Sequence, residues 1–257
     1  MPVRFVLGRA GTGKTHFCLE ALLAELSRAD DERRLILLVP EQAAFQMERT
    51  LALRAPGGGY WRAEVLSFSR LARRVLDRPG TTPDVLSPEA REFALRAVVA
   101  RRGPSLTALR RTAATRGFFA QFGRLIEELL SENITPADLL SAAERLDEPT
   151  ARRQTCETAQ IYADYLAWLG PQRIDPATQL AVLRQRLEHV AWLGQTDIWV
   201  DGFAGFTGQE VDTLVALARR ARNVTITLLL DPVSTAVRNP RESPDPLGLF
   251  CRTESTY

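Results

Sequence analysis

Runs of apolar residues alternate with segments of helical periodicity in the first part of the chain. The runs predict strands over residues 3–7, 35–39 and 64–68. The run Leu35–Val39 is apolar at every position, which is typical of a parallel strand covered on both faces. Apolar positions at helical spacing predict helices over residues 16–27, 41–49 and 69–76. This alternation predicts a doubly wound parallel sheet with right-handed crossovers.

The pattern becomes helical between about Ser87 and Val190, where we find no convincing strand. A capping side chain followed by proline marks helix starts at Ser87-Pro88, Thr135-Pro136 and Asp175-Pro176. Apolar stripes predict further helices over residues 118–130 and 151–169. The predicted apolar face of the first helix, which begins after Ser87, consists of Phe93, Leu95, Ala97 and Val98. Aromatic residues in this block are interpreted as core rather than as base-stacking surfaces.

Strands resume towards the end of the chain. They are predicted over residues 197–201 and 224–231, with a helix over residues 209–221 between them. We therefore predict an α/β domain formed by residues 1–85 and 191–257, into which residues 86–190 are inserted as an all-helical subdomain. Ligands of open parallel sheets bind at the carboxyl ends of the strands.

Composition fits a globular chain and leaves the class of partner open. The chain has 257 residues, 45% of them apolar, and a net charge of +2 from 33 basic and 31 acidic side chains. This balance neither requires nor excludes nucleic acid. The chain begins directly with a strand and has no apolar run of about 18 residues. We therefore expect a soluble cytoplasmic protein without a membrane span.

Cysteine and histidine do not predict a metal site. Cys18, Cys156 and Cys251 are odd in number and far apart, so neither a disulfide framework nor a zinc site is expected. His16 and His189 show no metal-ligand spacing. These residues are interpreted as structural or surface positions.

The strongest chemical signal is the segment Gly8-Arg9-Ala10-Gly11-Thr12-Gly13-Lys14-Thr15. It fits the phosphate-loop pattern G-x-x-x-x-G-K-[ST], with a predicted strand before it and a predicted helix after it. The glycines allow the backbone N–H groups to converge on an anion, and the helix N-terminus favours negative charge there. Lys14, the only lysine, supplies a compact charge for the β- and γ-phosphates of ATP. Every residue of the segment is a candidate nucleotide ligand.

Oxygen ligands for Mg²⁺ are predicted at two positions. Thr15 supplies a hydroxyl at the end of the phosphate-loop pattern, and Asp201 ends the apolar strand over residues 197–201. A carboxylate at the end of such a strand, well downstream of the loop, is the expected Walker B ligand of Mg²⁺. No residue is predicted to be catalytic beyond this possible role of Asp201.

Several segments resemble superfamily 1 helicases of the UvrD/Rep kind, in the same order along the chain. They are Gly8–Thr15, Leu37–Met47, Val65–Leu76, Ile161–Tyr165 and Trp199–Phe203. The resemblance to the AddB family of helicase–nuclease subunits is closer and covers nearly the whole chain. It is carried by Gly8–Thr15, Leu38–Ala43 and Val200–Thr207. This resemblance implies a RecA-like P-loop NTPase fold, with an inserted helical subdomain.

The resemblance also implies a function. It implies the N-terminal, helicase-like region of a helicase–nuclease subunit that repairs double-strand breaks by homologous recombination and binds DNA, including the Chi signal. The expected cofactors are ATP and Mg²⁺, and the expected partner is an AddA-like helicase–nuclease subunit in a heterodimer. The family's nuclease and iron–sulfur cluster belong to a C-terminal region that this chain lacks. We interpret the chain as an N-terminal fragment, because Phe250–Tyr257 shows no helix-stop or tail character.

Departures from active helicases imply a weak or inactive motor. Gly202 stands where active helicases carry the carboxylate that orients water, and glycine has no side chain to do so. Leu230-Asp231-Pro232 stands where they carry a glutamine that senses the γ-phosphate. The second motor domain, which supplies arginines to that phosphate, is also missing from the chain. We therefore expect ATP binding with weak or no hydrolysis and no translocation by this chain alone.

Candidate DNA contacts follow the third predicted strand. They are Phe68, Arg70, Arg73 and Arg74, with Arg62 just before that strand. Arginines can contact DNA phosphates, although the solvated face of a helix is the favoured interpretation. Two other functions stay open. A P-loop kinase of small substrates explains Lys14 and Asp201 but not the other helicase-like segments, and a structural scaffold would hold its nucleotide without hydrolysing it.

Overall fold

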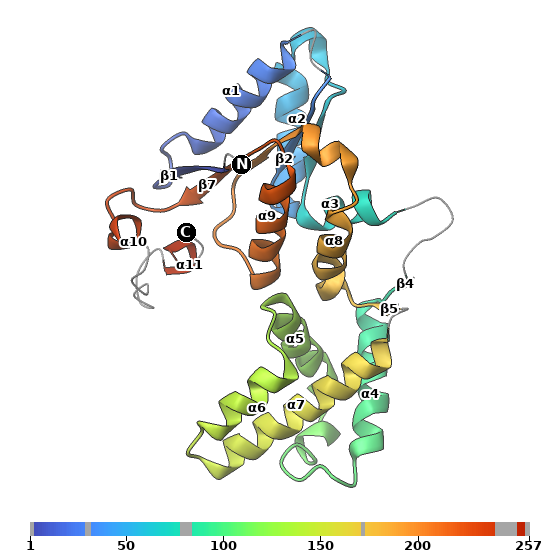
Figure 1. The fold of residues 1–257 in the computed structure, drawn as a ribbon. Helices are drawn as coiled ribbons and strands as arrows, with labels where there is room; N and C mark the ends of the chain where they lie inside the picture. Colours follow the sequence, from blue (N-terminus) through green and yellow to red (C-terminus); the bar gives the residue numbers. More distant parts are fainter. Residues whose placement is uncertain (1–2, 29–31, 78–83, 171–172, 240–250, 255–257) are drawn as a thin grey trace. The chain divides into compact units, whose positions relative to one another are not determined.

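The computed structural model describes residues 3–28, 32–77, 84–170, 173–239 and 251–254 (Figure 1). The segment Phe250–Tyr257 therefore lies partly outside the described residues. The chain forms two compact units, one from residues 1–76 and 180–257 and one from residues 77–179. The sequence pattern instead predicts later boundaries, at residues 85/86 and 190/191.

The first unit contains a five-stranded sheet in the order β1-β7-β6-β2-β3, in which every neighbouring pair is parallel. The strands are β1 Val3–Gly8, β2 Arg34–Leu38, β3 Ala63–Leu66, β6 Thr196–Val200 and β7 Asn223–Leu229. This confirms the predicted α/β class and the parallel sheet. Because all strands run in one direction, the segments that follow Gly8, Leu38 and Val200 emerge at the same edge of the sheet.

Helices cover both faces of this sheet (Figure 1). One face packs against α1 Lys14–Leu26 and α2 Glu41–Arg54, and the other packs against α3 Phe68–Leu76, α8 Gln179–Leu187 and α9 Gly208–Arg220. The apolar run from Leu35 to Leu38 in β2 is explained by the alternation of its side chains between the two faces of the sheet. Leu35 and Leu37 point into the first core, whereas Ile36 and Leu38 point into the second. Shorter elements of this unit are η1 Pro56–Gly58, η4 Ala191–Gln195, α10 Thr235–Arg238 and α11 Cys251–Glu254.

Helix α8 belongs to the sheet unit and not to the helical insertion in which the sequence pattern places it. Leu183 and Leu187 are buried with residues of β6 and α9 on one face of the sheet. Asp175 marks a helix start in the sequence, but it caps only the short turn η3 Pro176–Thr178, after which α8 begins. The spacing of apolar residues identifies this helix, but it contains no information about which core the helix contacts.

The second unit is built from helices around its own apolar core. Its helices are α4 Pro88–Arg102, η2 Thr112–Ala114, α5 Phe118–Ser131, α6 Pro136–Glu144 and α7 Pro149–Leu169. The predicted caps are confirmed, because the Ser87 side chain accepts from the Ala90 amide and Thr135 forms a capping box with Asp138. The prediction that this span lacks strands is wrong at one place. Strand β5 Arg173–Ile174 pairs in parallel with β4 Asp84–Val85.

The apolar face predicted for α4 is partly wrong. Leu95 and Val98 are buried as predicted, whereas Phe93 is 76% exposed and Ala97 is also exposed; the helix buries Ala94 and Val99 in their place, against α5 and α7. Helical periodicity is compatible with either set of residues.

A buried ion pair ties the end of this unit to its helices. Asp175 is fully buried, and its carboxylate accepts from Arg91 Nε at 2.8 Å and from Arg91 Nη2 at 2.7 Å. The Tyr165 hydroxyl donates to the same carboxylate at 2.5 Å. Burial raises the pKa of Tyr165, and this hydrogen bond and the charge of Asp175 raise it further, so the hydroxyl stays protonated. The network joins α4 and α7 to the segment that leaves the unit.

Candidate functional site

The segment Gly8–Thr15 connects β1 to α1 at the carboxyl edge of the sheet. Gly11 and Gly13 have positive φ values of 77° and 85°, a conformation that favours glycine. Gly13 is the N-cap of α1 and provides no side-chain cap, so the first-turn N–H groups keep their capacity to bind an external anion. A Cβ atom at Gly8 would lie 2.4 Å from Thr12 Oγ1, so a side chain there would displace the Thr12 hydroxyl. The backbone of this segment therefore favours glycine at these positions.

Lys14 folds back over this segment. Its Nζ donates to the Gly8 carbonyl at 2.7 Å and to the Arg9 carbonyl at 2.9 Å. Thr12 Oγ1 donates to the same Arg9 carbonyl at 2.8 Å. These bonds hold the only lysine ammonium of the chain against the backbone carbonyls at the start of the segment.

An ion pair that the sequence pattern does not predict joins Arg9 of this segment to Asp231. Arg9 Nε donates to Asp231 Oδ2 at 3.1 Å, and Arg9 Nη2 also contacts that oxygen. The hydrogen bond from Arg9 and the Val233 amide hold the pKa of Asp231 below its usual value. Asp231 follows β7, which lies beside β1 in the sheet. The signal is present in the sequence, since Asp231 also ends an apolar strand, but only the strand order shows that it faces Arg9.

Asp201 follows β6 at the same edge of the sheet and is buried. Its amide donates to the Leu38 carbonyl at 2.9 Å, and its carboxylate accepts from the Thr227 hydroxyl at 2.6 Å. Burial of Cys18, together with the nearby charge of Asp201, raises the pKa of that thiol to about 12. Cys18 lies one helical turn after Thr15 on α1. Asp201 and Thr15 thus both belong to segments that follow strands at the carboxyl edge of the sheet.

Gly202 lies directly after Asp201 and has a positive φ of 84°. A side chain at this position would strain the backbone even though the space around it is open, since a Cβ atom would contact only Pro40. The chain thus turns sharply after the Asp201 carboxylate and continues to Phe203.

The structure does not support Phe68 as a DNA contact. Its ring is only 5% exposed and packs edge-on against Phe203 at 5.4 Å and Phe206 at 6.4 Å between ring centroids. Phe68 lies far from Phe203 and Phe206 in the sequence, and the sequence alone does not show whether such a residue is exposed or buried. In the structure all three pack into the core on one face of the sheet.

The candidate arginines differ in their availability. Arg62 is buried and donates to the backbone carbonyls of Arg33, Glu25 and Arg28, so it has a structural role. Arg70 pairs with Glu48 at 2.6 Å, and Arg74 pairs with Glu64 at 3.1 Å. Arg73 is exposed and forms no ion pair within the described part of the chain. Of this set, Arg73 is the side chain that could contact a phosphate without breaking an existing pair.

Comparison with known proteins identifies the family. The family model described as "ADDB, N-terminal" matches residues 5–257. The chain belongs to the ADDB N-terminal family. A protein of Moorella thermoacetica, named as the B subunit of an ATP-dependent helicase/deoxyribonuclease, is 41% identical over 239 residues, which cover 90% of this chain and 21% of that protein. Proteins of the same name from Desulforudis audaxviator and Pelotomaculum thermopropionicum are 40% and 38% identical over 241 and 262 residues.

These ADDB relatives are much longer than the matched region. The matches cover 91% and 100% of this chain but 20% and 22% of the Desulforudis and Pelotomaculum proteins. The chain therefore spans about a fifth of the length of the curated relatives it matches. Because the relatives are named as one lettered subunit of an enzyme, the name implies another subunit in their complex.

The described residues set two limits on the chemistry of this chain. No helix in the described ranges is long and apolar enough to cross a membrane. The same ranges contain no cluster of three or more His, Cys, Asp and Glu side chains that could hold a metal ion by itself.

Proposed function

We propose that this chain is the ATP-binding, helicase-like part of a helicase/deoxyribonuclease subunit of the ADDB family. ATP binds to the segment Gly8–Thr15, where Lys14 and the backbone N–H groups contact its phosphates. Thr15 and Asp201 would hold Mg²⁺ together with phosphate oxygens, and the ion would supply positive charge to the phosphates. The residues of the chain bind and orient the nucleotide.

The observation that carries this proposal is the position of Lys14. Its ammonium donates to the Gly8 and Arg9 carbonyls, in a segment where Gly11 and Gly13 have positive φ and where the N-terminus of α1 has no side-chain cap. A positive charge, N–H donors and the helix dipole thus belong to one short segment, which is the combination that a polyphosphate requires. The fit for Mg²⁺ rests on donor chemistry, because a hydroxyl and a carboxylate at one edge of the sheet are the oxygen ligands this ion prefers.

The nucleotide in this proposal regulates shape more than it drives movement. Gly202 offers no carboxylate to orient water, and Leu230-Asp231-Pro232 offers no glutamine towards the γ-phosphate. We therefore expect weak or no hydrolysis by this chain and no translocation on its own. If hydrolysis is absent altogether, the chain acts as a structural scaffold that only binds the nucleotide.

At the level of the whole protein, we propose a role in double-strand break repair by homologous recombination in the cytoplasm. The protein would work with an AddA-like partner and bind DNA, including the Chi signal. This part of the proposal rests on family membership and on the names of the relatives. Arg73 is the candidate phosphate contact that needs no rearrangement.

The experiment that tests nucleotide binding replaces the lysine. A fluorescent ATP analogue should bind the wild type in the presence of Mg²⁺, and Lys14→Ala should weaken binding by about 10- to 100-fold, since a charge-assisted contact contributes roughly 1.5–3 kcal/mol. Arg219→Ala is the matched control, because it removes one exposed positive charge in the last turn of α9, outside the segment Gly8–Thr15.

The outcomes separate the alternatives. Equal affinity of Lys14→Ala and the wild type would refute the proposed site. Phosphate release by the wild type at the rate of an ordinary motor would refute the inactive-motor part. Transfer of phosphate to a small molecule would instead support a kinase.

A further inference from the structure

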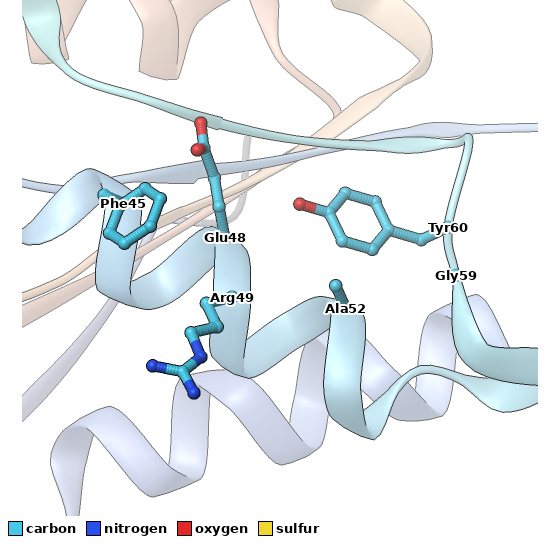
Figure 2. A pocket seen from close by; sticks show the side chains of 6 residues that line it. All are labelled: Phe45, Glu48, Arg49, Ala52, Gly59 and Tyr60. Carbon is cyan, nitrogen blue, oxygen red and sulfur yellow. The ribbon is translucent and has the colours of Figure 1, made fainter.

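Helix α2 and the segment before β3 expose an unusual group of aromatic side chains. Phe45 on α2 is 75% exposed, and Trp61 just before β3 is 83% exposed. Beside them is an open pocket of about 460 Å³, lined by Phe45, Glu48, Arg49, Ala52, Gly59 and Tyr60. Figure 2 shows the Phe45 and Tyr60 rings at opposite ends of this pocket, with Glu48 between them. Large exposed apolar side chains beside a hollow are typical of a binding surface.

The polar groups of this pocket provide one unpaired positive charge. The Glu48 carboxylate is neutralised by Arg70, whose Nη1 lies 2.6 Å away. Arg49 has no ion pair or hydrogen bond with any described residue, and its guanidinium extends from the same helix, α2 (Figure 2). Burial and the charge of Glu48 raise the pKa of Tyr60, so its hydroxyl remains a hydrogen-bond donor at neutral pH. The pocket therefore offers two apolar rings and donors suited to an anionic group.

The pocket lies away from the proposed nucleotide site within the same unit. Gly59 and Tyr60 lead into β3, which is the strand at one side of the sheet. The segment Gly8–Thr15 follows β1, which is the strand at the other side. A ligand in the pocket would therefore leave the nucleotide site accessible.

The charge pattern favours a protein over nucleic acid as the ligand. Stacking surfaces for single-stranded DNA combine aromatic rings with a groove of several basic residues. Here the pocket lining contains one unpaired arginine, Arg49, since the charge of Glu48 is neutralised by Arg70. Exposed Phe, Tyr, Trp and Arg are instead the residues enriched at the centres of protein interfaces.

We propose that this pocket docks a segment of the partner protein, with an apolar side chain between Phe45 and Tyr60 and an adjacent carboxylate on Arg49. The partner is indicated by the relatives' name, which describes one subunit of a larger enzyme, and the carboxylate by charge complementarity with the unpaired Arg49. The inference rests on one part of the proposed function, namely that the protein works in a complex with a partner subunit. It does not depend on ATP binding.

Site-specific photocrosslinking in the assembled complex tests the occupant directly. The full-length protein, carrying p-benzoylphenylalanine in place of Phe45, is co-purified with its partner, irradiated and analysed by mass spectrometry. Crosslinks to a peptide of the partner that contains Asp or Glu are expected. Crosslinks to the same polypeptide, to a second copy of it or to added oligo(dT) would overturn the proposal. The same photoreactive residue at Val215, an exposed apolar position on the opposite face of the sheet, is the control for non-specific labelling.

Affinity measurements on variants provide the second test. Phe45→Ser and Arg49→Glu should each weaken binding of the purified partner by at least about tenfold, as expected for central interface residues. Leu53→Ser removes an equally exposed apolar side chain of α2 that does not line the pocket, and it should change affinity less than about threefold. Equal effects of all three variants, or none, would contradict the proposal.

These variants also separate this inference from the proposed nucleotide site. Phe45→Ser should bind the fluorescent ATP analogue as the wild type does, which also shows that the variant is folded. Lys14→Ala should retain its affinity for the partner. If nucleotide binding fails in the wild type while the pocket variants still lose the partner, only the proposed function is refuted.

Discussion

At the residue scale, the candidate site is held by short contacts that its own side chains make. Lys14 and Thr12 donate to backbone carbonyls of the loop, and Arg9 pairs with Asp231. The loop pattern is readable from the sequence because its glycines and lysine have fixed spacing. The Arg9–Asp231 pair is not, because its members follow neighbouring strands that are distant in sequence. This carboxylate reduces the positive charge that the loop offers to a nucleotide.

Removing that carboxylate should therefore strengthen nucleotide binding. Asp231→Asn frees Arg9 and makes the loop more positive, so ATP affinity should rise about two- to fivefold, the effect of an exposed ion pair. Titration of the fluorescent ATP analogue measures the change. Asp147→Asn, an exposed carboxylate in the other unit, is the control. Weaker binding by Asp231→Asn would mean that the pair shapes the loop rather than competing with phosphate.

Gly202 leads to a second residue-scale prediction. Gly202→Glu should not restore hydrolysis, because the positive φ disfavours any side chain and the segment Leu230-Asp231-Pro232 contains no glutamine. We expect a loss of stability of about 1–2 kcal/mol and a gain in phosphate release below about threefold. Gly202→Ala has the same strain without the carboxylate and separates the two effects in denaturant unfolding and phosphate-release assays. A large gain in turnover would show that Gly202 was the only defect.

At the scale of elements, buried carboxylates hold loops against helices, and such contacts cannot be predicted from the spacing of apolar residues. Glu157 on α7 accepts hydrogen bonds from the amides of Thr107, Ala108 and Leu109 and from the Thr107 hydroxyl, all at 2.7–2.9 Å. It thereby holds the connection between α4 and α5 against α7. The caps at Ser87 and Thr135 are predictable because they act within a few residues, whereas Glu157 acts across about fifty residues of sequence.

The stabilising effect of Glu157 should depend on pH. Burial raises its pKa, but the amides of Ala108, Leu109 and Thr107 lower it by more, so the folded-state pKa lies below the usual value. A depressed carboxyl pKa stabilises the fold above the unfolded-state pKa, and this contribution is lost as the pH falls through the folded-state pKa.

Glu157→Gln tests this pH dependence. At pH 7 we expect a loss of about 2 kcal/mol, from hydrogen bonds to a charged acceptor. The difference from the wild type should stay constant down to about pH 5 and close below about pH 4. Thermal unfolding between pH 3 and pH 8 measures it, with exposed Glu144→Gln as the control. A difference that persists unchanged at pH 3 would exclude the charge as its source.

At the scale of the whole molecule, the chain contains separate hydrophobic cores. Two cores lie on the faces of the sheet, and a third lies among α4, α5 and α7. The helical unit also carries its own closing contacts, since β4 pairs with β5 and Arg91 binds Asp175. These contacts join its beginning to its end within residues 77–179.

The helical unit should therefore fold when it is expressed alone as residues 77–179. We expect a helical circular dichroism spectrum and one cooperative thermal transition. Asp175→Asn should destabilise this fragment by about 1.5–3 kcal/mol, because it removes the buried negative charge that Arg91 binds and leaves Arg91 paired only with Glu127. Asp147→Asn is the exposed control. A fragment without a cooperative transition would show that this unit needs the rest of the chain to fold.

The sequence by itself determined the α/β class, the positions of most helices and strands, and the loop Gly8–Thr15, since these depend on local periodicity and spacing. Only the tertiary structure decided which core each helix joins, that Phe68 is buried, and that Arg9 meets Asp231. The physical reason is that the spacing of apolar residues indicates which side chains are buried, but not which helix or sheet face they pack against. Contacts between distant segments, including those of the buried carboxylates, follow from strand order and packing.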